Sequence, residues 1–229
     1  YSDFAVLMRV NALSRSFEQQ FGRQRIPFKV FGGFKFFERK EIKDLTAYLR
    51  FIVNPLDNDA ILRIINTPKR GIGDKTINEL IRYCTEKNIS LFDGLCENDW
   101  LDLSASAKMR LELFKQLLFK LALLNDSMTL DKLVNQVIED TNFLSQFVDN
   151  TEENLSRRMN VDEFKNSVYE FCRFNKEATL DEYLGSIALY SDIDEADSSD
   201  YVSIATIHAV KGLEFKTVFI VGLDETIFP

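Results

Sequence analysis

Apolar residues recur along the chain with two different periods, and the change of period separates both ends from the middle. Two short apolar runs of strand length lie near the N-terminus, at 4–8 and 28–31. Two more lie near the C-terminus, at 202–207 and 217–221, and they are rich in β-branched residues, as buried parallel strands are. The pattern therefore predicts strands at both ends of the chain.

Between these ends, from residue 35 to about residue 189, apolar residues recur at the spacing of helices. Nearer the N-terminus, Ser14 is predicted to cap a helix over 15–22. The helical stripes are typical of core faces in a bundle, so we assign them no chemistry. They fall within residues 42–53, 61–65, 77–84, 114–121, 130–138, 161–171 and 180–187.

Residues 191–200 contain five acids and three serines with little apolar content, which predicts a flexible linker before the last two strands. The predicted fold class is α/β with a large all-helical insertion, in which the two chain ends meet in one sheet. The predicted domain boundaries are 1–34 with 200–229 for the sheet, and 35–199 for the helical insertion.

Charge is distributed unevenly along the 229 residues, whose net charge is -8. Residues 1–82 contain 15 basic and 9 acidic side chains, whereas residues 83–229 contain 13 basic and 27 acidic ones. This polarity predicts one face that attracts phosphate and another that stays solvated.

The three cysteines, Cys84, Cys96 and Cys172, lack the paired spacing of metal ligands, so we expect a reduced thiol state and no metal site. No stretch approaches the roughly 18 apolar residues of a membrane span. We expect a soluble, cytoplasmic protein with no membrane association. Because the chain starts at Tyr1 without methionine, we also expect it to be a piece of a longer protein.

One polar segment, residues 206–215, lies between the last two predicted strands. On its own, the single histidine, His208, is typical of a surface or packing residue. Lys211 precedes Gly212, whereas a phosphate loop has glycine before lysine, so this is not a Walker A motif. By spacing alone the segment is a polar loop at a strand end, where α/β sheets place ligands.

The string from Thr206 to Phe215, continuing through 218–222 and 225–229, resembles motif V of the UvrD/PcrA/Rep family of superfamily 1 DNA helicases. The resemblance implies a loop shared by single-stranded DNA and nucleotide. It implies single-stranded DNA contacts by Thr206, His208 and Lys211. It implies nucleotide contacts by Gly212 and Glu214.

The opening segment is similar to a strand and loop of the family's second RecA-like domain, called 2A. There Arg9, Asn11 and Arg15 would hold phosphates of single-stranded DNA, although a solvated loop is an open alternative. Residues 32–44 resemble the family's entry into its inserted helical domain, called 2B.

A third segment, residues 66–77, contains a glycine-isoleucine-glycine hairpin between two predicted helices. Free backbone N–H groups at the start of the second helix, with basic side chains around them, are suited to a phosphate, although from spacing alone a plain helix-to-helix turn is an open alternative. In the resembling family this hairpin contacts duplex DNA. The predicted contact residues are Lys69, Arg70, Gly71, Ile72, Gly73, Lys75 and Thr76.

The chain contains no Walker A glycine loop, and the Asp-Glu pairs at 181–182, 194–195 and 224–225 do not follow a buried strand with a Walker A partner upstream, so we predict no catalytic residue and no ATP hydrolysis by this chain alone. The resemblance implies an ATP-dependent 3′-to-5′ DNA helicase that uses ATP and Mg²⁺ when intact. Its partners would be DNA, ATP and repair or replication proteins bound through 2B. Two alternatives remain open: the helicase subunit of a RecB or AddA type nuclease, and a helical protein-interaction module.

Overall fold

The computed structural model describes residues 1–97, 102–125, 128–175, 177–192 and 200–224. Their contacts divide the chain into two compact units. The first comprises Tyr1–Lys43, Asp149–Ser167 and the C-terminal part from Gly185, and the second comprises Asp44–Val148 and Val168–Leu184. Helices that contribute residues to both units are α2 (Lys40–Val53), α8 (Glu152–Phe174) and α9 (Leu180–Asp192).

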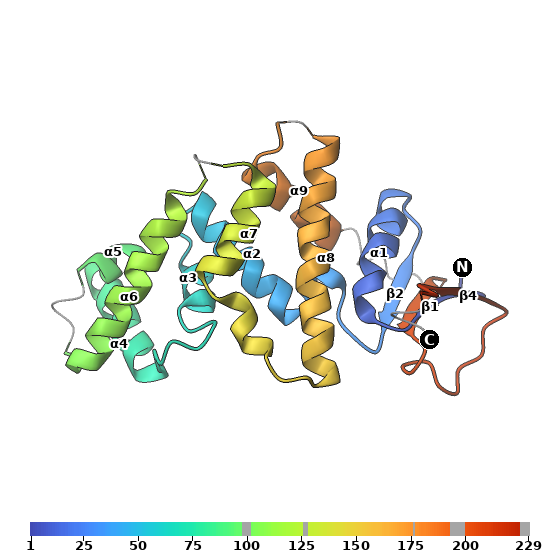
Figure 1. The fold of residues 1–229 in the computed structure, drawn as a ribbon, viewed down its shortest axis with the longest axis horizontal. Coiled ribbons are helices and arrows are strands. Elements are labelled where there is room, and N and C mark those ends of the chain that lie inside the picture. The colour runs from blue at the N-terminus through green and yellow to red at the C-terminus, as the bar shows by residue number, and fades with distance from the viewer. Residues whose placement is uncertain (98–101, 126–127, 176, 193–199, 225–229) are drawn as a thin grey trace. The chain divides into compact units, whose positions relative to one another are not determined.

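The first unit contains a parallel sheet to which both ends of the chain contribute strands (Figure 1). Its strand order is β2-β3-β1-β4, so Val6 of β1 pairs with Ile204 of β3 on one side and with Phe219 of β4 on the other. The strands are β1 (Phe4–Met8), β2 (Phe28–Phe31), β3 (Val202–Thr206) and β4 (Thr217–Val221). The predicted meeting of the two chain ends in one α/β sheet is confirmed.

Alternate residues of the central strands form an apolar layer on each face of this sheet, as the period of two requires. Ala5 and Leu7 pack on one face with Ala205. Val6 and Met8 pack on the other, where α1 (Ser14–Arg23) covers them with Phe17 and Phe21. Figure 1 shows α1 lying beside the sheet.

The start of α1 differs from the sequence prediction. A short 3₁₀ turn over Asn11–Leu13 leads into the helix, Leu13 occupies the cap position, and Ser14 already lies inside the helix. The Ser14 hydroxyl does not cap because it is buried among polar partners: it donates to Glu18 and accepts a 2.7 Å hydrogen bond from Arg39. The predicted serine cap is therefore wrong.

The second unit is helical, and its core consists of the predicted stripes. Leu49, Ile61, Leu80, Phe114 and Val137 are each at most 1% exposed. Besides parts of α2, α8 and α9, its helices are α3 (Asn58–Ile64), α4 (Asp74–Lys87), α5 (Leu91–Cys96), α6 (Ala105–Ala122) and α7 (Leu130–Asp140). A side chain caps α6, since the Ser104 hydroxyl accepts a hydrogen bond from the Ala107 amide.

The sequence analysis missed α5, which is only six residues long. Its signal was a serine followed three residues later by an acid: the Ser90 hydroxyl accepts from the Asp93 amide and donates 2.7 Å to the Asp93 carboxylate. The predicted linker begins later than expected, because α9 extends to Asp192, and residues 193–199 lie outside the described part. None of the described helices is long and apolar enough to cross a membrane.

Candidate nucleic-acid interface

The carboxyl ends of the four parallel strands lie along one edge of the sheet, so the segments that follow them are brought together there. Arg9 and Asn11 follow β1, and His208 and Lys211 follow β3. The Ile207 amide of the second segment donates a 3.0 Å hydrogen bond to the Met8 carbonyl at the end of β1. Residues about 200 positions apart thus share one surface.

Arg9 and His208 are in direct contact at this edge. The Arg9 Nη1 atom lies 3.1 Å from Nδ1 and 3.2 Å from Nε2 of His208, and both side chains are exposed. At the start of the loop, the Thr206 hydroxyl lies 3.4 Å from the Ala209 amide, which also donates to the Thr206 carbonyl. A cation beside an imidazole on a solvated surface is suited to binding a phosphate or a base edge.

Glycines after β2 allow the neighbouring loops to approach this cluster. Gly32 has a φ of 75°, and a Cβ atom there would lie 2.3 Å from the Ala209 side chain. At Gly33 a Cβ atom would lie 3.4 Å from the Asn11 side-chain amide. Only glycine permits the first of these approaches, so the chain turns tightly against the loop that carries His208.

Arg39 holds the backbone of Asn11 in place. The Arg39 Nη2 atom donates 2.9 Å to the Asn11 carbonyl, while Nη1 donates 2.7 Å to Asn160 of α8. Burial lowers the pKa of the Arg39 guanidinium, and the nearby carboxylates Glu18 and Glu41 oppose that effect. The sequence analysis gave Arg39 no role, and the structure places it as a support of the loop after β1.

Arg15 lies apart from the exposed cluster, although it was predicted to contact DNA together with Arg9 and Asn11. It is 2% exposed, its Nε atom pairs with Glu163 of α8 at 2.5 Å, and Nη1 donates 2.8 Å to Gln19. A guanidinium occupied in this way holds α1 to α8. We therefore do not include Arg15 among the DNA contacts that we propose below.

The loop after His208 is open. Lys211, Gly212 and Glu214 are all exposed. Gly212 has a φ of 92°, and a Cβ atom there would meet no atom within 4 Å. Among the described residues no carboxylate forms an ion pair with Lys211. The backbone turn thus leaves space beside a lysine and a glutamate.

In the second unit, the hairpin of residues 69–73 joins the segment after α3 to α4. Ile72 is 1% exposed and fixes the hairpin to the core, whereas Gly71 and Gly73 on either side of it are exposed. The Gly73 carbonyl accepts hydrogen bonds from the amides of Thr76 and Ile77 at the start of α4. The amides of Asp74 and Lys75 precede these and have no partner among the described residues, as is usual in a first helical turn.

Lys69 and Lys75 are exposed at the two ends of this hairpin. On α4, the exposed Asp74 directly precedes Lys75, and Glu79, one turn later, accepts hydrogen bonds of 2.6 and 3.2 Å from Arg82. Neither lysine forms an ion pair within the described part of the chain. Thr76 is 9% exposed, so its side chain belongs to the core side of α4.

Arg70 has a different position, because its guanidinium points into the unit. Nη1 donates to the carbonyls of Ile64 and Pro68 at 2.9 and 3.2 Å, and Nη2 donates 2.6 Å to the Tyr48 hydroxyl. The guanidinium also lies 5.4 Å from the ring centre of Phe114. Arg70 therefore fixes the shape of the hairpin from inside.

A family model described as the UvrD-like helicase C-terminal domain matches residues 1–229. The chain belongs to this family. It is 39% identical over 232 residues to the ATP-dependent DNA helicase PcrA of Staphylococcus aureus (strain Mu50 / ATCC 700699). It is 38% identical over 232 residues to the PcrA of Staphylococcus epidermidis (strain ATCC 12228 / FDA PCI 1200). Both alignments cover the whole chain but only 32% of each relative, so the chain spans about a third of their length.

This membership confirms the resemblance found in the sequence to the UvrD/PcrA/Rep family. In the UvrD-like domain described here, the predicted contact residues that are not occupied inside a unit lie in two places, one in each compact unit. The strand-end surface is formed by Arg9, Asn11, Thr206, His208 and Lys211, and the hairpin surface is formed by Lys69, Gly71, Gly73 and Lys75. The sequence analysis missed one exposed arginine at the hairpin, Arg110 of α6, whose Nη1 atom donates 2.6 Å to the Gly71 carbonyl.

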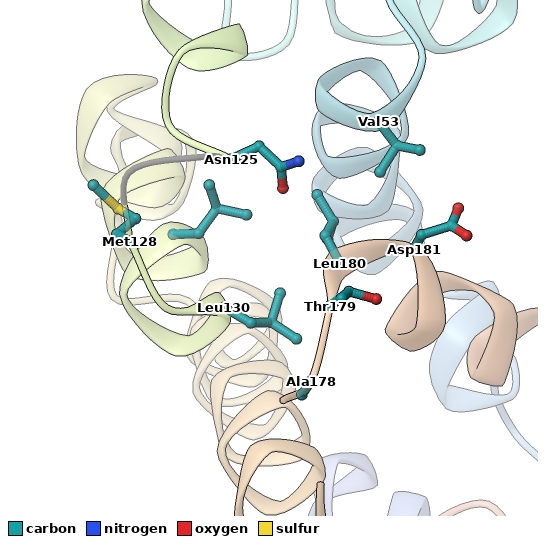
Figure 2. Close-up of a pocket in the computed structure, with 9 residues that line it drawn as sticks. Val53, Asn125, Met128, Leu130, Ala178, Thr179, Leu180 and Asp181 are labelled. Carbon is teal, nitrogen blue, oxygen red and sulfur yellow. The ribbon is translucent and has the colours of Figure 1, made fainter. Parts of the chain in front are cut away.

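The second unit of this UvrD-like domain also contains a hollow of about 340 Å³, shown in Figure 2. Its lining is apolar in part, with Val53, Leu130 and Leu180, and Asp181 lies at its edge. Among the residues that the structure describes, no group of three or more histidine, cysteine or acidic side chains is placed to hold a metal ion.

Proposed function

We propose that this chain is the C-terminal part of an ATP-dependent 3′-to-5′ DNA helicase that acts in DNA repair or replication in the cytoplasm. Residues 1–34 and 200–229 would belong to a RecA-like domain 2A, and residues 35–199 to the helical domain 2B. The polarity, the pathway and these domain names depend on the family resemblance. The observation that carries the proposal is the strand-end surface, where Arg9 contacts His208 from the opposite end of the chain.

The strand-end surface is assigned to single-stranded DNA. Arg9 and Lys211 supply positive charge for phosphates, while Asn11, Thr206 and His208 supply hydrogen-bonding groups at the same edge of the sheet. Because β1 and β3 are paired neighbours, the loops that follow them start side by side, and a shift of one loop would act on the other. This coupling would let nucleotide bound near one loop alter the hold on DNA.

The nucleotide is assigned to the open loop at Gly212 and Glu214. The space beside Gly212 and the exposed Glu214 carboxylate fit a sugar whose hydroxyl groups donate to that carboxylate. ATP bound in the whole enzyme supplies the free energy of its hydrolysis, and this chain contributes only binding and orientation of the sugar. The described residues gather no carboxylate cluster for Mg²⁺, so we assign it no ligand here.

The hairpin surface is assigned to duplex DNA. Lys69 and Lys75 are placed to neutralise phosphates, and the amides at the start of α4 face the same exposed turn. Such contacts carry no sequence information, so binding would be independent of base sequence. Arg70 supports the turn and is not one of the proposed phosphate contacts.

The test for the strand-end surface compares two lysines on opposite edges of the same sheet. Lys211 follows β3 at the carboxyl edge, whereas Lys216 precedes β4 at the amino edge and pairs at 3.0 Å with Asp3. Binding of the chain to a labelled oligothymidine is measured by fluorescence anisotropy at several salt concentrations. Lys211→Gln and Arg9→Gln should each reduce the log-log salt slope by about 0.7, the value per phosphate of a single strand.

Lys216→Gln is the matched control and should leave the slope unchanged. Equal effects of Lys211→Gln and Lys216→Gln would overturn the assignment to the carboxyl edge. For duplex DNA, the corresponding pair is Lys75→Gln at the start of α4 and Lys87→Gln at its end. If none of these variants changes the salt slope, the protein-interaction module becomes the better explanation of the helical unit.

A further inference from the structure

Arg110 of α6 contacts the hairpin, although it lies 39 residues after Gly71 in the sequence. Its Nη1 atom donates 2.6 Å to the Gly71 carbonyl. A Cβ atom at Gly71 would lie 2.9 Å from Nη1, 3.0 Å from Cζ and 3.2 Å from Nε of Arg110. The plane of the guanidinium therefore lies against the backbone of the turn, in a space that only glycine leaves open.

The position of Arg110 follows from the way α6 packs. Phe114, one turn later on the same side of the helix, is 0% exposed and lies under the Arg70 guanidinium. Phe114 thus holds α6 next to the hairpin, within reach of Arg110. Arg70 donates to the carbonyls of Ile64 and Pro68 before the hairpin, and Arg110 donates to that of Gly71 within it.

The contact also changes the electrostatics of the exposed turn. A free carbonyl oxygen at Gly71 would present a negative partial charge toward an approaching phosphate, and Arg110 covers it with a cation. A guanidinium has five N–H donors, and only one is used at Gly71. Arg110 is exposed and forms no ion pair within the described residues, so its other donors are available to solvent.

We propose that Arg110 is a further duplex-binding residue of the hairpin surface: it covers the Gly71 carbonyl and presents its remaining N–H donors to a phosphate of the duplex. A planar guanidinium can donate to two oxygens of one phosphate, which an ammonium group does less well. The inference depends on the proposed duplex-binding role of the hairpin. It adds a cation from α6 to Lys69 and Lys75 and makes the site span two helices of the unit.

The test uses the 229-residue chain, a labelled 20-base-pair duplex of arbitrary sequence, and anisotropy titrations between 50 and 200 mM salt. Arg110→Gln should reduce the log-log salt slope by about 0.9, the value per phosphate of a duplex. Arg110→Lys should preserve the slope, because the charge remains, while its affinity falls between those of the parent and of Arg110→Gln. Lys87→Gln is the control for loss of one exposed positive charge elsewhere in the same unit.

The outcomes separate the two proposals. If Lys75→Gln reduces the slope and Arg110→Gln does not, the hairpin binds DNA but Arg110 only supports its shape, and the inference about Arg110 is wrong. If neither variant changes the slope, the duplex-binding role of the hairpin itself is overturned. Thermal unfolding of each variant shows whether a change in affinity comes from loss of folded protein. Such a loss lowers the apparent affinity, but it does not change the salt slope by the amount expected for one phosphate contact.

Discussion

The two glycines of the hairpin should respond to substitution in opposite ways. Gly71 has a φ of 72° and has the Arg110 guanidinium where a Cβ atom would go, whereas Gly73 has a φ of -89° and open space around it. We expect Gly71→Ala to reduce the stability of the fold. We expect Gly73→Val to leave stability nearly unchanged and to weaken duplex binding.

The magnitudes follow from these geometries. At Gly71, an alanine in the left-handed region costs about 1–2 kcal/mol. Displacing Arg110 from the Gly71 carbonyl costs about 0.5–1.5 kcal/mol more. Alanine also restricts the unfolded chain, which offsets about 0.4–1 kcal/mol of this cost. The net loss in the free energy of unfolding is roughly 2 kcal/mol. At Gly73, valine is a poor cap but fits the extended backbone, so the change should stay within about 1 kcal/mol.

The assay combines urea unfolding followed by circular dichroism with duplex titration by anisotropy. Gly73→Val should unfold at nearly the parent's urea concentration yet bind duplex DNA more weakly at equal salt, because its side chain occupies the approach to the first amides of α4. Gly73→Ala, with a smaller side chain, should give a smaller loss. The reasoning is refuted if Gly71→Ala is as stable as the parent, or if Gly73→Val binds duplex DNA like the parent.

Four further variants test the buried interactions. Glu163→Ala should lower the free energy of unfolding by about 3 kcal/mol because it leaves the Arg15 charge buried, whereas changing both residues to Met should recover most of it in the same urea assay. Arg70→Met should lower the free energy of unfolding by about 3 kcal/mol, about one for each of three lost hydrogen bonds. The salt slope of duplex binding should stay unchanged, whereas a slope reduced by about 0.9 would show that Arg70 contacts a phosphate. Burial raises the pKa of Tyr48 from 10.0 to about 12, so the unfolded chain loses this proton at a lower pH than the folded chain does. The free energy of unfolding should therefore fall as pH rises from 10 to 12. An equal fall in the Tyr48→Phe variant would disprove this.

Much of the fold could be predicted from the sequence, because the strands and the longer helices have unambiguous periods. The four strands and the buried stripes at residues such as Leu80 and Phe114 required only the alternation of apolar positions. The sequence also indicated that the ends meet, since strands occur only there. The pattern could not indicate the strand order, because both β3 and β4 are short apolar runs that could have paired with β1 from either side.

The residues of the candidate sites were predicted by type and the structure separates them by environment. Arg9, Arg15 and Arg70 look equivalent in the sequence, yet Arg9 is exposed while Arg15 and Arg70 are occupied by partners inside their units. The partner of Arg15 is 148 residues away and that of Arg9 is 199 residues away. No local pattern contains such distances, which is also why Arg110 was missed.

Two of the predicted DNA-binding arginines, Arg15 and Arg70, have partners inside their units, and this changes how the charge of the basic N-terminal third should be interpreted. Its excess of cations suggested a phosphate-binding face. However, the guanidinium groups of Arg15, Arg39 and Arg70 donate hydrogen bonds to internal partners, which are a carboxylate, a side-chain amide and a backbone carbonyl respectively. Of the cations that remain exposed, Lys69, Lys75 and Lys211 lie within two residues of an exposed glycine. At such sites a phosphate meets backbone amides and side-chain charge together. We therefore expect the position of each turn, more than the number of basic residues, to decide where this chain would hold nucleic acid.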